Sequence, residues 1–314
     1  MWKYFDSTRF LLSLNFLDKK EDSEIIKEIY AISNNVENNY KVFKIRKRNG
    51  KYRTIYEPNS ILKHIQRELL NNVLYDIKVS EYAKAYKKNT SLKDNALVHT
   101  NKNIILKLDI EDFFDNISFT NIYNKCFNIE KFPKSIGVLF TTLVTYEGYL
   151  PQGAPTSAYI SNLVMKDFDE YIGNYCNQNN IDYTRYSDDM TFSGDFNPSE
   201  LIKIVRKNLY KLGLKLNNDK IHIVNRSSSQ NVTGIVVNEK VQISSKYRKK
   251  IRQEIYYIKK FGLQSHLDNS KYNLQPKSYI NSLHGRILYV LQINDNDLEF
   301  KKYEQYILDL KKTI

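Results

Sequence analysis

Two acidic side chains stand next to each other at Asp188 and Asp189, inside the stretch YTRYSDDMTFSG. The flanking residues are β-branched and aromatic, so this stretch predicts two short strands joined by a hairpin turn at the acidic pair. A third acid, Asp109, ends the stretch IILKLDI, whose alternating pattern predicts a half-buried strand. If both elements belong to one sheet, the three carboxylates meet at its edge. Such a cluster needs cations to neutralise it, and hard oxygen ligands suit Mg²⁺.

Two metal ions about 3.5–4 Å apart can activate a 3′-hydroxyl group and stabilise the oxygen of a leaving pyrophosphate. Nucleotidyl transfer is therefore the chemistry that the three carboxylates could support together. For either acidic group alone, a solvated acidic loop or an ordinary turn is the alternative. The sequence contains no GxGxxG, GxxxxGK[ST], HExxH or GxSxG motif, so other common nucleotide-binding and hydrolytic sites lack support.

The elements that position these carboxylates belong to a basic, folded protein. The 314 residues include 25 Tyr and 15 Phe, which is ample material for a core, and the length fits one enzyme with subdomains. A formal charge of +13 favours nucleic acid over membrane as a partner, although a basic proteome would also explain it. Cys126 and Cys176 are too few for a disulfide framework and lack the CxxC spacing of a zinc site. With no signal peptide and no membrane-spanning apolar run, the sequence predicts a cytoplasmic protein.

Helical and strand patterns alternate along the chain, and several strands are consecutive. KIRKRNGKYRTIYEP predicts a basic β-hairpin that turns at Asn49-Gly50. Apolar residues at helical spacing follow Ser60 and Ser199, both possible caps, and also run through PTSAYISNLVMKDFDEYIGNYC. The C-terminal part predicts basic helices. Together these elements predict an α+β fold, with an antiparallel sheet backed by helices, rather than a doubly wound parallel sheet.

Four stretches in order resemble the palm motifs of reverse transcriptases. LDIEDFFDNI, LPQGAPTSAYISNLV and YTRYSDDMTFSG resemble motifs A, B and C, and GLKLNNDKIHI resembles the lysine-bearing motif D. NAxxH at Asn95–His99 and VTG at Val232–Gly234 resemble two boxes typical of bacterial retron reverse transcriptases. The resemblance implies a right-hand polymerase fold with four parts: an N-terminal helical extension (1–40), fingers (41–105), palm (106–240) and a basic helical thumb (241–314).

The resemblance also implies which residues hold the catalytic metal ions. Two Mg²⁺ ions would be bound by Asp109, Ile110, Asp188 and Asp189, with Asp189 in a more supporting part. Lys220 would give a proton or a positive charge to the departing pyrophosphate, unless it is only a surface lysine. Ser187 stands where alanine is commoner in retrons, and we expect little effect on metal binding.

Other motif residues are implied to bind the incoming nucleotide. Phe114 would be the steric gate that selects dNTPs over NTPs, although a core aromatic like Phe113 is the alternative. Gln152 and Gly153 would approach the nucleotide and the template base, and Arg53 would pair with the triphosphate. Four neighbouring basic residues of the hairpin could assist or could simply be solvated: Arg46, Lys47, Arg48 and Lys51.

RNA binding is expected at the two retron-like boxes and on one C-terminal helix. A buried core histidine at position 99, a chance VTG strand and an ordinary solvated helix face are the alternatives. Binding to an RNA backbone would weaken steeply with salt. The residues concerned are Asn95, His99, Val232, Thr233 and Gly234 in the boxes, and Arg248, Lys249, Lys250 and Arg252 on the helix.

A retron-type enzyme would bind its cognate noncoding RNA and prime from a 2′-hydroxyl group within that RNA. It would copy part of the RNA into a single-stranded DNA that stays attached (msDNA), and host RNase H would trim the template. The resemblance further implies antiphage defence with a separate effector protein. The alternatives are a group II intron or abortive-infection reverse transcriptase, or a catalytically silent RNA-binding defence subunit. The intact Asp109, Asp188 and Asp189 disfavour the last of these.

Overall fold

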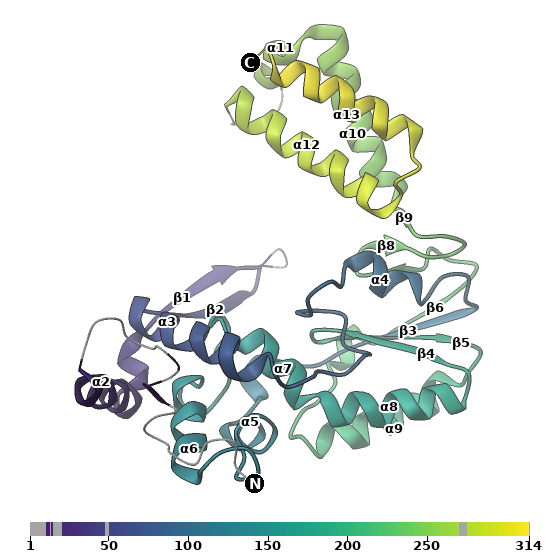
Figure 1. The fold of residues 1–314 in the computed structure, drawn as a ribbon. Coiled ribbons are helices and arrows are strands. Elements are labelled where there is room, and N and C mark those ends of the chain that lie inside the picture. Colours follow the sequence, from purple (N-terminus) through teal and green to yellow (C-terminus); the bar gives the residue numbers. More distant parts are fainter. Residues whose placement is uncertain (1–10, 13, 15–20, 48–49, 270–274, 314) are drawn as a thin grey trace. The chain divides into compact units, whose positions relative to one another are not determined.

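The structure, a computed structural model, describes residues 11–12, 14, 21–47, 50–269 and 275–313 (Figure 1). The chain forms two compact units, each assembled from two stretches of sequence: Met1–Thr90 with Leu106–Ile223, and Ser91–Ile105 with Val224–Ile314. The NAxxH segment, which we expected beside the fingers, therefore belongs to the unit that contains the C-terminal helices. The division into fingers, palm and thumb remains a prediction.

The first unit opens with helix α2 (Asp22–Asn34) and the 3₁₀ helix η1 (Val36–Asn39), followed by a two-stranded sheet. Strands β1 (Tyr40–Arg46) and β2 (Tyr52–Pro58) pair antiparallel along their whole length. The amide of Gly50 donates to the carbonyl of Lys47 at 3.0 Å, and Gly50 has a φ of +84°. A glycine is favoured there because a side chain strains this backbone conformation. Asn49 lies outside the described residues.

Both helix caps that we expected at serine were wrong. Helix α3 (Ser60–Leu69) begins after Asn59, whose side chain accepts a hydrogen bond from the Leu62 amide at 2.9 Å. Helix α9 (Pro198–Tyr210) begins after Asn197, which accepts from the Ser199 amide at 3.1 Å. Asparagine caps a helix as well as serine does, so the sequence pattern could not separate these neighbouring candidates.

The first unit contains further helices. The α3 helix continues as the π-helical turn η2 (Leu70–Leu74). The 3₁₀ helix η3 (Phe114–Asn116) follows the first sheet strand, and α5 (Phe119–Cys126) and α6 (Lys134–Leu143) come next. Residues 157–178 form two helices, α7 (Ser157–Val164) and α8 (Lys166–Gln178). The apolar pattern of the sequence indicated one continuous helical segment there.

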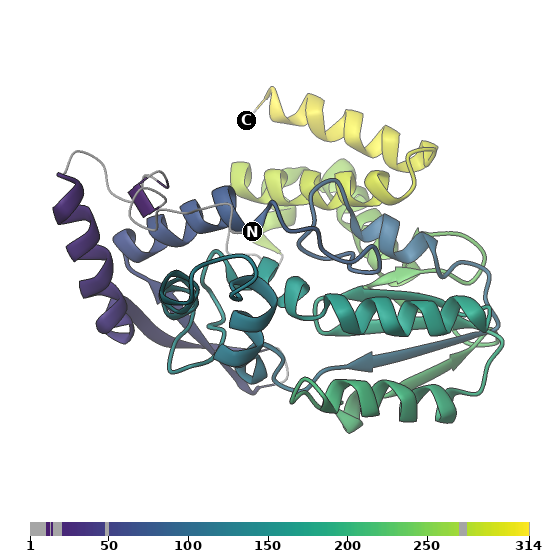
Figure 2. The same cartoon turned by 60° about the horizontal axis from the view of Figure 1, so that its bottom comes forward.

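A four-stranded sheet carries the acidic residues. Its strand order is β4 (Asp182–Tyr186), β5 (Asp189–Gly194), β3 (Ile104–Asp109) and β6 (His222–Asn225). Helices α8 and α9 cover one face of this sheet in both views (Figures 1 and 2). Buried apolar side chains from the sheet and these helices share one core, including Leu106, Leu108, Met190, Phe192 and Ile172. This antiparallel hairpin with helices packed on the sheet confirms the predicted α+β class.

The second unit combines a small sheet with helices. Strands β7 (Asn231–Val232), β8 (Ile235–Val236) and β9 (Gln242–Ile243) form an antiparallel sheet beside the short helix α4 (Leu92–Leu97). The remaining elements are α10 (Ser245–Phe261), α11 (Leu263–Asp268), α12 (Pro276–Ile293) and α13 (Leu298–Lys311). Their apolar faces form a core of their own, which confirms that the described C-terminal residues are helical. No helix in the described part of the chain is long and apolar enough to cross a membrane.

Candidate active site

The hairpin turn between β4 and β5 brings the three predicted carboxylates to one edge of the sheet. Tyr186 pairs with Asp189, which leaves Ser187 and Asp188 as a two-residue loop. The amide of Ile110, one residue after Asp109, donates to the carbonyl of Asp188 at 3.1 Å. Strands β3 and β5 are neighbours in the sheet, so Asp109 ends beside the acidic turn, as the sequence pattern predicted.

Lys220 completes this cluster in the structure. Its Nζ atom donates to both carboxylate oxygens of Asp109, at 2.9 and 2.8 Å. The backbone holds the lysine in place, because the Asn217 amide donates to the Asp109 carbonyl at 2.9 Å and the 3₁₀ helix η4 (Asn218–Lys220) follows directly. The motif D lysine is therefore an ion-pair partner of the motif A aspartate rather than an isolated surface residue.

The carboxylates influence one another electrostatically. Desolvation and the negative charges of Asp188 and Asp109 raise the pKa of Asp189 to about 6. Desolvation also raises the pKa of Asp109, and the hydrogen bond from Lys220 opposes that rise. Without a metal ion, the cluster is thus balanced by the Lys220 ammonium and by partial protonation of Asp189 near pH 6.

The donor set fits a magnesium site, although the cluster is not preassembled as one. Among the described residues, no three acidic, histidine or cysteine side chains already surround a position that would suit a metal ion. The Lys220 ammonium contacts both carboxylate oxygens of Asp109. A cation therefore already binds Asp109, and a divalent ion would have to displace it. Oxygen donors are what Mg²⁺ prefers.

A buried ion pair that our sequence analysis missed supports the acidic turn. Arg185 and Asp169 are both fully buried, and the guanidinium donates twice to the carboxylate, from Nε at 2.8 Å and from Nη2 at 2.7 Å. The remaining nitrogen, Nη1, donates to the carbonyl of Ser187 at 2.9 Å. Tyr183 also donates to Asp169, at 2.8 Å. The ion pair thus fixes the backbone immediately before Asp188.

The side chain of Ser187 has a partner of its own. Its Oγ atom lies 3.1 Å from the hydroxyl of Tyr86, and its backbone has a φ of +63°. The segment that contains Tyr86 also runs beside β4, where the Arg185 amide donates to the Tyr82 carbonyl at 2.8 Å. Alanine at position 187 could not make this contact, so Ser187 adds a hydrogen bond at the turn.

The sequence did carry a signal for the missed pair. Asp169 falls among the buried apolar positions of its helix, next to Phe168 and three residues before Ile172. An acid on the buried face of a helix needs a charged partner, and Arg185 lies on a strand with no other assigned role. The pattern indicated that each residue needed a partner, but it did not indicate which one.

The two neighbouring aromatic rings of motif A differ in burial. Phe113 is buried in the core, whereas Phe114 is half-buried and packs against it with ring centroids 5.4 Å apart. Only Phe114 therefore keeps an accessible surface that an incoming sugar could meet. This difference supports Phe114 as the candidate gate, and the gating role itself remains a prediction.

Motif B is in direct contact with the β1–β2 hairpin. The Tyr56 amide donates to the Gln152 carbonyl at 2.9 Å. Gly153 has a φ of +127°, and a Cβ atom there would lie 2.8 Å from the Tyr56 carbonyl oxygen and 3.0 Å from a methyl group of Ile55. The glycine thus allows strand β2 to approach motif B. Arg53 is exposed on the same strand.

The two retron-like boxes meet inside the second unit. The Asn95 side-chain amide donates to the Thr233 hydroxyl at 3.4 Å, and Thr233 and Gly234, both with positive φ, form the turn between β7 and β8. Asn95, His99 and Val232 are buried. We expected these three to bind RNA, and that role remains a prediction, although their burial leaves these side chains little surface for direct contact with a ligand. The contact between Asn95 and Thr233 joins α4 to the turn of the small sheet. Thr233 and Gly234 remain accessible.

The basic cluster on α10 is partly neutralised within the protein. Arg248 pairs with Asp297 and Glu299, and Arg252 donates to Glu299 at 2.6 Å from both Nε and Nη2. The hydrogen bonds from Arg252 lower the pKa of Glu299 to about 2. Lys249 and Lys250 are exposed, so they are the better candidates of the predicted cluster for contact with RNA.

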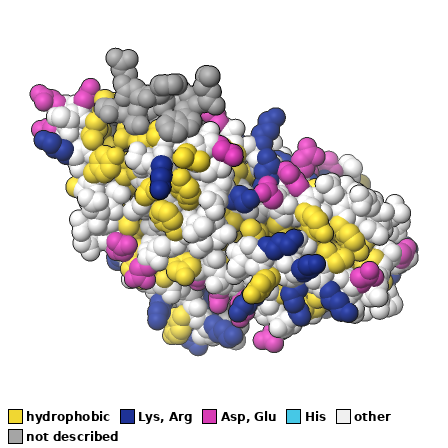
Figure 3. All heavy atoms as spheres, turned by 90° about the horizontal axis from the view of Figure 1, so that it is seen from below, with side chains coloured by type: hydrophobic (Ala, Val, Ile, Leu, Met, Phe, Trp, Pro, Cys, Tyr) yellow, Lys and Arg dark blue, Asp and Glu magenta, His cyan; other side chains and the backbone are white. Residues whose placement is uncertain are grey.

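Charged side chains of the described residues are visible in the space-filling view of Figure 3. On the face shown, Lys and Arg side chains are interspersed with acidic and apolar ones (Figure 3).

Comparison with known proteins agrees with this site. A family model described as reverse transcriptase (RNA-dependent DNA polymerase) matches residues 45–242. The chain belongs to the reverse transcriptase family. It is 32% identical to the retron Ec86 reverse transcriptase of Escherichia coli over 226 residues, which are 70% of each chain. It is 30% identical to the retron Ec83 reverse transcriptase of the same species over 292 residues, 87% of this chain and 90% of that one.

These relatives place the reverse transcriptase among the retron enzymes, and its activity is that of an RNA-directed DNA polymerase. The foamy viral protease-reverse transcriptase, solved in complex with double-stranded DNA, shares the fold at a TM-score of 0.51 and 15% identity. That match covers 88% of this chain and 39% of the viral chain. The predicted right-hand polymerase fold is thereby confirmed.

Proposed function

We propose that this reverse transcriptase binds a structured noncoding RNA and copies part of it into single-stranded DNA, starting from a 2′-hydroxyl group of that RNA. The observation that carries the catalytic part is the meeting of Asp109, Asp188 and Asp189 at one sheet edge. The likeness to retron reverse transcriptases supports the priming mode and the product, msDNA. From the same likeness we propose a role in antiphage defence with a separate effector protein.

Asp109, Asp188 and the main-chain carbonyl of Ile110 would hold two Mg²⁺ ions, with Asp189 in support. When bound, the ions would activate the attacking hydroxyl and stabilise the leaving pyrophosphate. Lys220, once displaced from Asp109, stays beside the site on η4 and can give a proton or a positive charge to the leaving group. The Arg185 contact to the Ser187 carbonyl keeps the turn in place during the reaction.

The residues around the carboxylates would select and orient the dNTP. Phe114 would exclude a ribose 2′-hydroxyl with its accessible ring surface. Arg53 would pair with the triphosphate. Because strand β2 contacts Gln152 and Gly153, this arginine would be held in a fixed position relative to motif B. The nucleotide would then lie between Arg53 on β2 and the backbone at Gly153, where no side chain stands in its way.

The priming mode is tested with the protein and the RNA that copurifies with it. Added Mg²⁺ and dNTPs are expected to yield a DNA that migrates with the RNA under denaturing conditions. Cleavage of 2′,5′-phosphodiester bonds by a debranching enzyme should then release the DNA. DNA synthesis that occurs only from an added primer with a free 3′-hydroxyl, with no RNA-linked product, would favour another class of bacterial reverse transcriptase.

Magnesium is expected to raise the melting temperature of the free protein by a few degrees at pH 7.5, because it binds the folded state alone. The required Mg²⁺ concentration should rise as pH falls below about 6, since protons compete for Asp189, whose pKa is raised to about 6. Without metal, the folded state binds the extra proton, so this group's contribution to stability falls as pH rises from about 4 to 6. Differential scanning fluorimetry over a pH series measures both effects.

The matched control for magnesium binding is the double variant Asp109→Asn plus Asp188→Asn. It removes two carboxylates without changing side-chain size, so it should show little response to Mg²⁺. An equal shift of the melting temperature in the double variant and the wild type would place the metal site elsewhere.

A further inference from the structure

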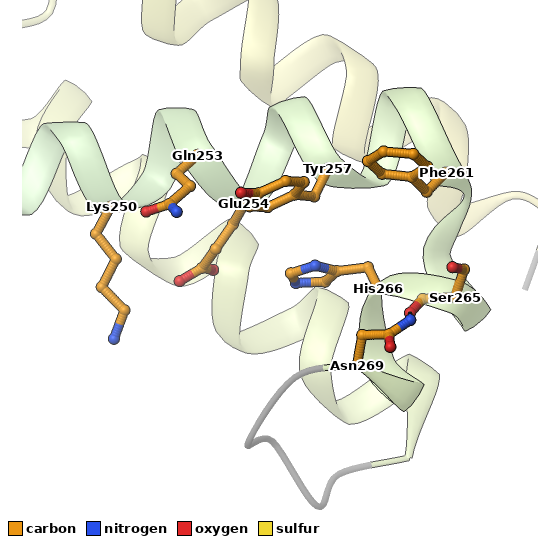
Figure 4. A pocket seen from close by; sticks show the side chains of 8 residues that line it. All are labelled: Lys250, Gln253, Glu254, Tyr257, Phe261, Ser265, His266 and Asn269. Atoms are coloured by element: carbon orange, nitrogen blue, oxygen red, sulfur yellow. Dashed lines mark hydrogen bonds between the residues drawn. The ribbon is translucent and has the colours of Figure 1, made fainter.

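A cavity of about 520 Å³ opens in the second unit between helices α10 and α11 (Figure 4). Tyr257 and Phe261 line it from α10, His266 lines it from α11, and Asn269 lines it just after the end of α11. Tyr257 is 38% exposed and Phe261 is 54% exposed, so both rings keep surface that a ligand could contact. The polymerase mechanism gives no role to this cavity, here named the α10–α11 pocket.

The aromatic residues of the α10–α11 pocket present nearly parallel rings. The Tyr257 ring stacks with Phe261 at a centroid distance of 6.1 Å and with His266 at 6.2 Å, with interplanar angles of 28° and 17°. Figure 4 shows the Tyr257 and His266 side chains on facing sides of the space between the two helices. Accessible parallel rings suit a flat aromatic ligand, and nucleobases are flat and aromatic.

A buried hydrogen-bond network fixes the orientation of His266. The Tyr279 hydroxyl donates to Glu254 at 2.9 Å, and the same carboxylate accepts from Arg286 at 2.9 Å. Because the single hydroxyl proton of Tyr279 is used in the bond to Glu254, the Tyr279 oxygen accepts the 2.9 Å hydrogen bond from Nε2 of His266. In this tautomer Nδ1 is an acceptor. Together with Gln253, which both donates and accepts, the pocket can bind the edge of a base.

The charge around the pocket favours a polyanion as the source of that base. Helix α10 carries Lys246, Lys249, Lys250, Lys259 and Lys260, and Lys250 lines the pocket itself. The acid of this helix, Glu254, is buried and paired with Arg286. A ligand with phosphates next to its bases is thus attracted along this helix, whereas an apolar ligand gains nothing from the lysines.

We propose that the α10–α11 pocket binds one unpaired nucleobase of the enzyme's RNA. The base stacks on Tyr257 and Phe261, and its edge hydrogen-bonds to Gln253 and His266. The base has to be unpaired, because a base inside an A-form helix offers neither a free face nor an accessible major-groove edge. This inference rests on the proposed binding of a structured RNA, and it identifies a single-stranded loop or bulge as the element that the second unit recognises.

The test uses the full-length protein and a short single-stranded RNA with one 2-aminopurine, compared with the same sequence in a duplex. Fluorescence titration without Mg²⁺ and dNTPs measures binding separately from catalysis. Tyr257→Leu is expected to weaken single-strand binding on the order of tenfold or more, and to weaken duplex binding much less. Tyr256→Leu is the matched control, since Tyr256 is 53% exposed on the same helix and does not line the pocket.

If Tyr257→Leu binds the single-stranded RNA with wild-type affinity at an unchanged melting temperature, the proposed role of the pocket is wrong. The polymerase proposal would remain intact. An equal loss in Tyr256→Leu would also overturn the proposed role of the pocket, because the helix surface and not the cavity would then bind RNA. Failure of the wild type to bind either RNA would contradict the proposed function itself. If Tyr257→Leu does not fold, Gln253→Ala at an exposed position serves as the second variant, with a smaller expected loss for the single strand alone.

Discussion

Replacing Asp188 by Asn is expected to reduce DNA synthesis on the order of 10³-fold or more while the protein stays folded. Asn has the same size as Asp but no negative charge, so it weakens binding of the divalent ions that the reaction needs. It also relieves repulsion, because the charge of Asp188 contributes to the raised pKa of Asp189 and Asp109. We therefore expect a melting temperature equal to or above that of the wild type. Primer extension and thermal melting of the same preparation measure the two effects.

The control for this prediction is Asp195→Asn. Asp195 is exposed just after Gly194, at the other end of β5, so its replacement changes the net charge equally without touching the cluster. It should retain wild-type synthesis. If Asp188→Asn also retained the wild-type rate, the acidic turn would not be the catalytic centre, and the catalytic part of the proposed function would be wrong.

Replacing Arg185 by Met is expected to destabilise the protein by about 3–5 kcal/mol, because it leaves the Asp169 carboxylate buried without a charged partner. The double variant Asp169→Leu plus Arg185→Met removes both charges, so it should recover much of that stability. It should not recover DNA synthesis, since the hydrogen bond from Arg185 to the Ser187 carbonyl is still missing and the turn that carries Asp188 is less constrained. Denaturant unfolding and primer extension separate these effects.

An exposed ion pair provides the comparison for Arg185. Lys125 pairs with Asp167 at 2.5 Å at the surface of the same unit, and Lys125→Met should cost no more than about 1 kcal/mol. If the double variant at 169 and 185 regained full synthesis together with its stability, the ion pair would act only on the fold. Arg185 would then have no part in positioning the catalytic turn.

The local pattern of the sequence determined much of the active-site edge. Alternation in IILKLDI and the hairpin pattern around Asp188 indicated two strands that end in acids, and the ordered motifs indicated that these strands share one sheet. Such features follow from neighbouring residues, because a strand's pattern and a two-residue turn are set within a few positions. The same locality explains the errors at Ser60 and Ser199, where an adjacent asparagine caps equally well.

Only the tertiary structure decided which distant residues meet. It paired Lys220 with Asp109, Arg185 with Asp169, and Asn95 with Thr233. The helical pattern indicated that the buried Asp169 needs a charged partner, but the choice among many candidates depends on how the helices pack on the sheets. The α10–α11 pocket likewise arises from the packing of two helices, since no run of residues along one helix encloses a space. Side chains far apart in sequence are brought within hydrogen-bond distance by the fold as a whole, and that information is absent from any local pattern.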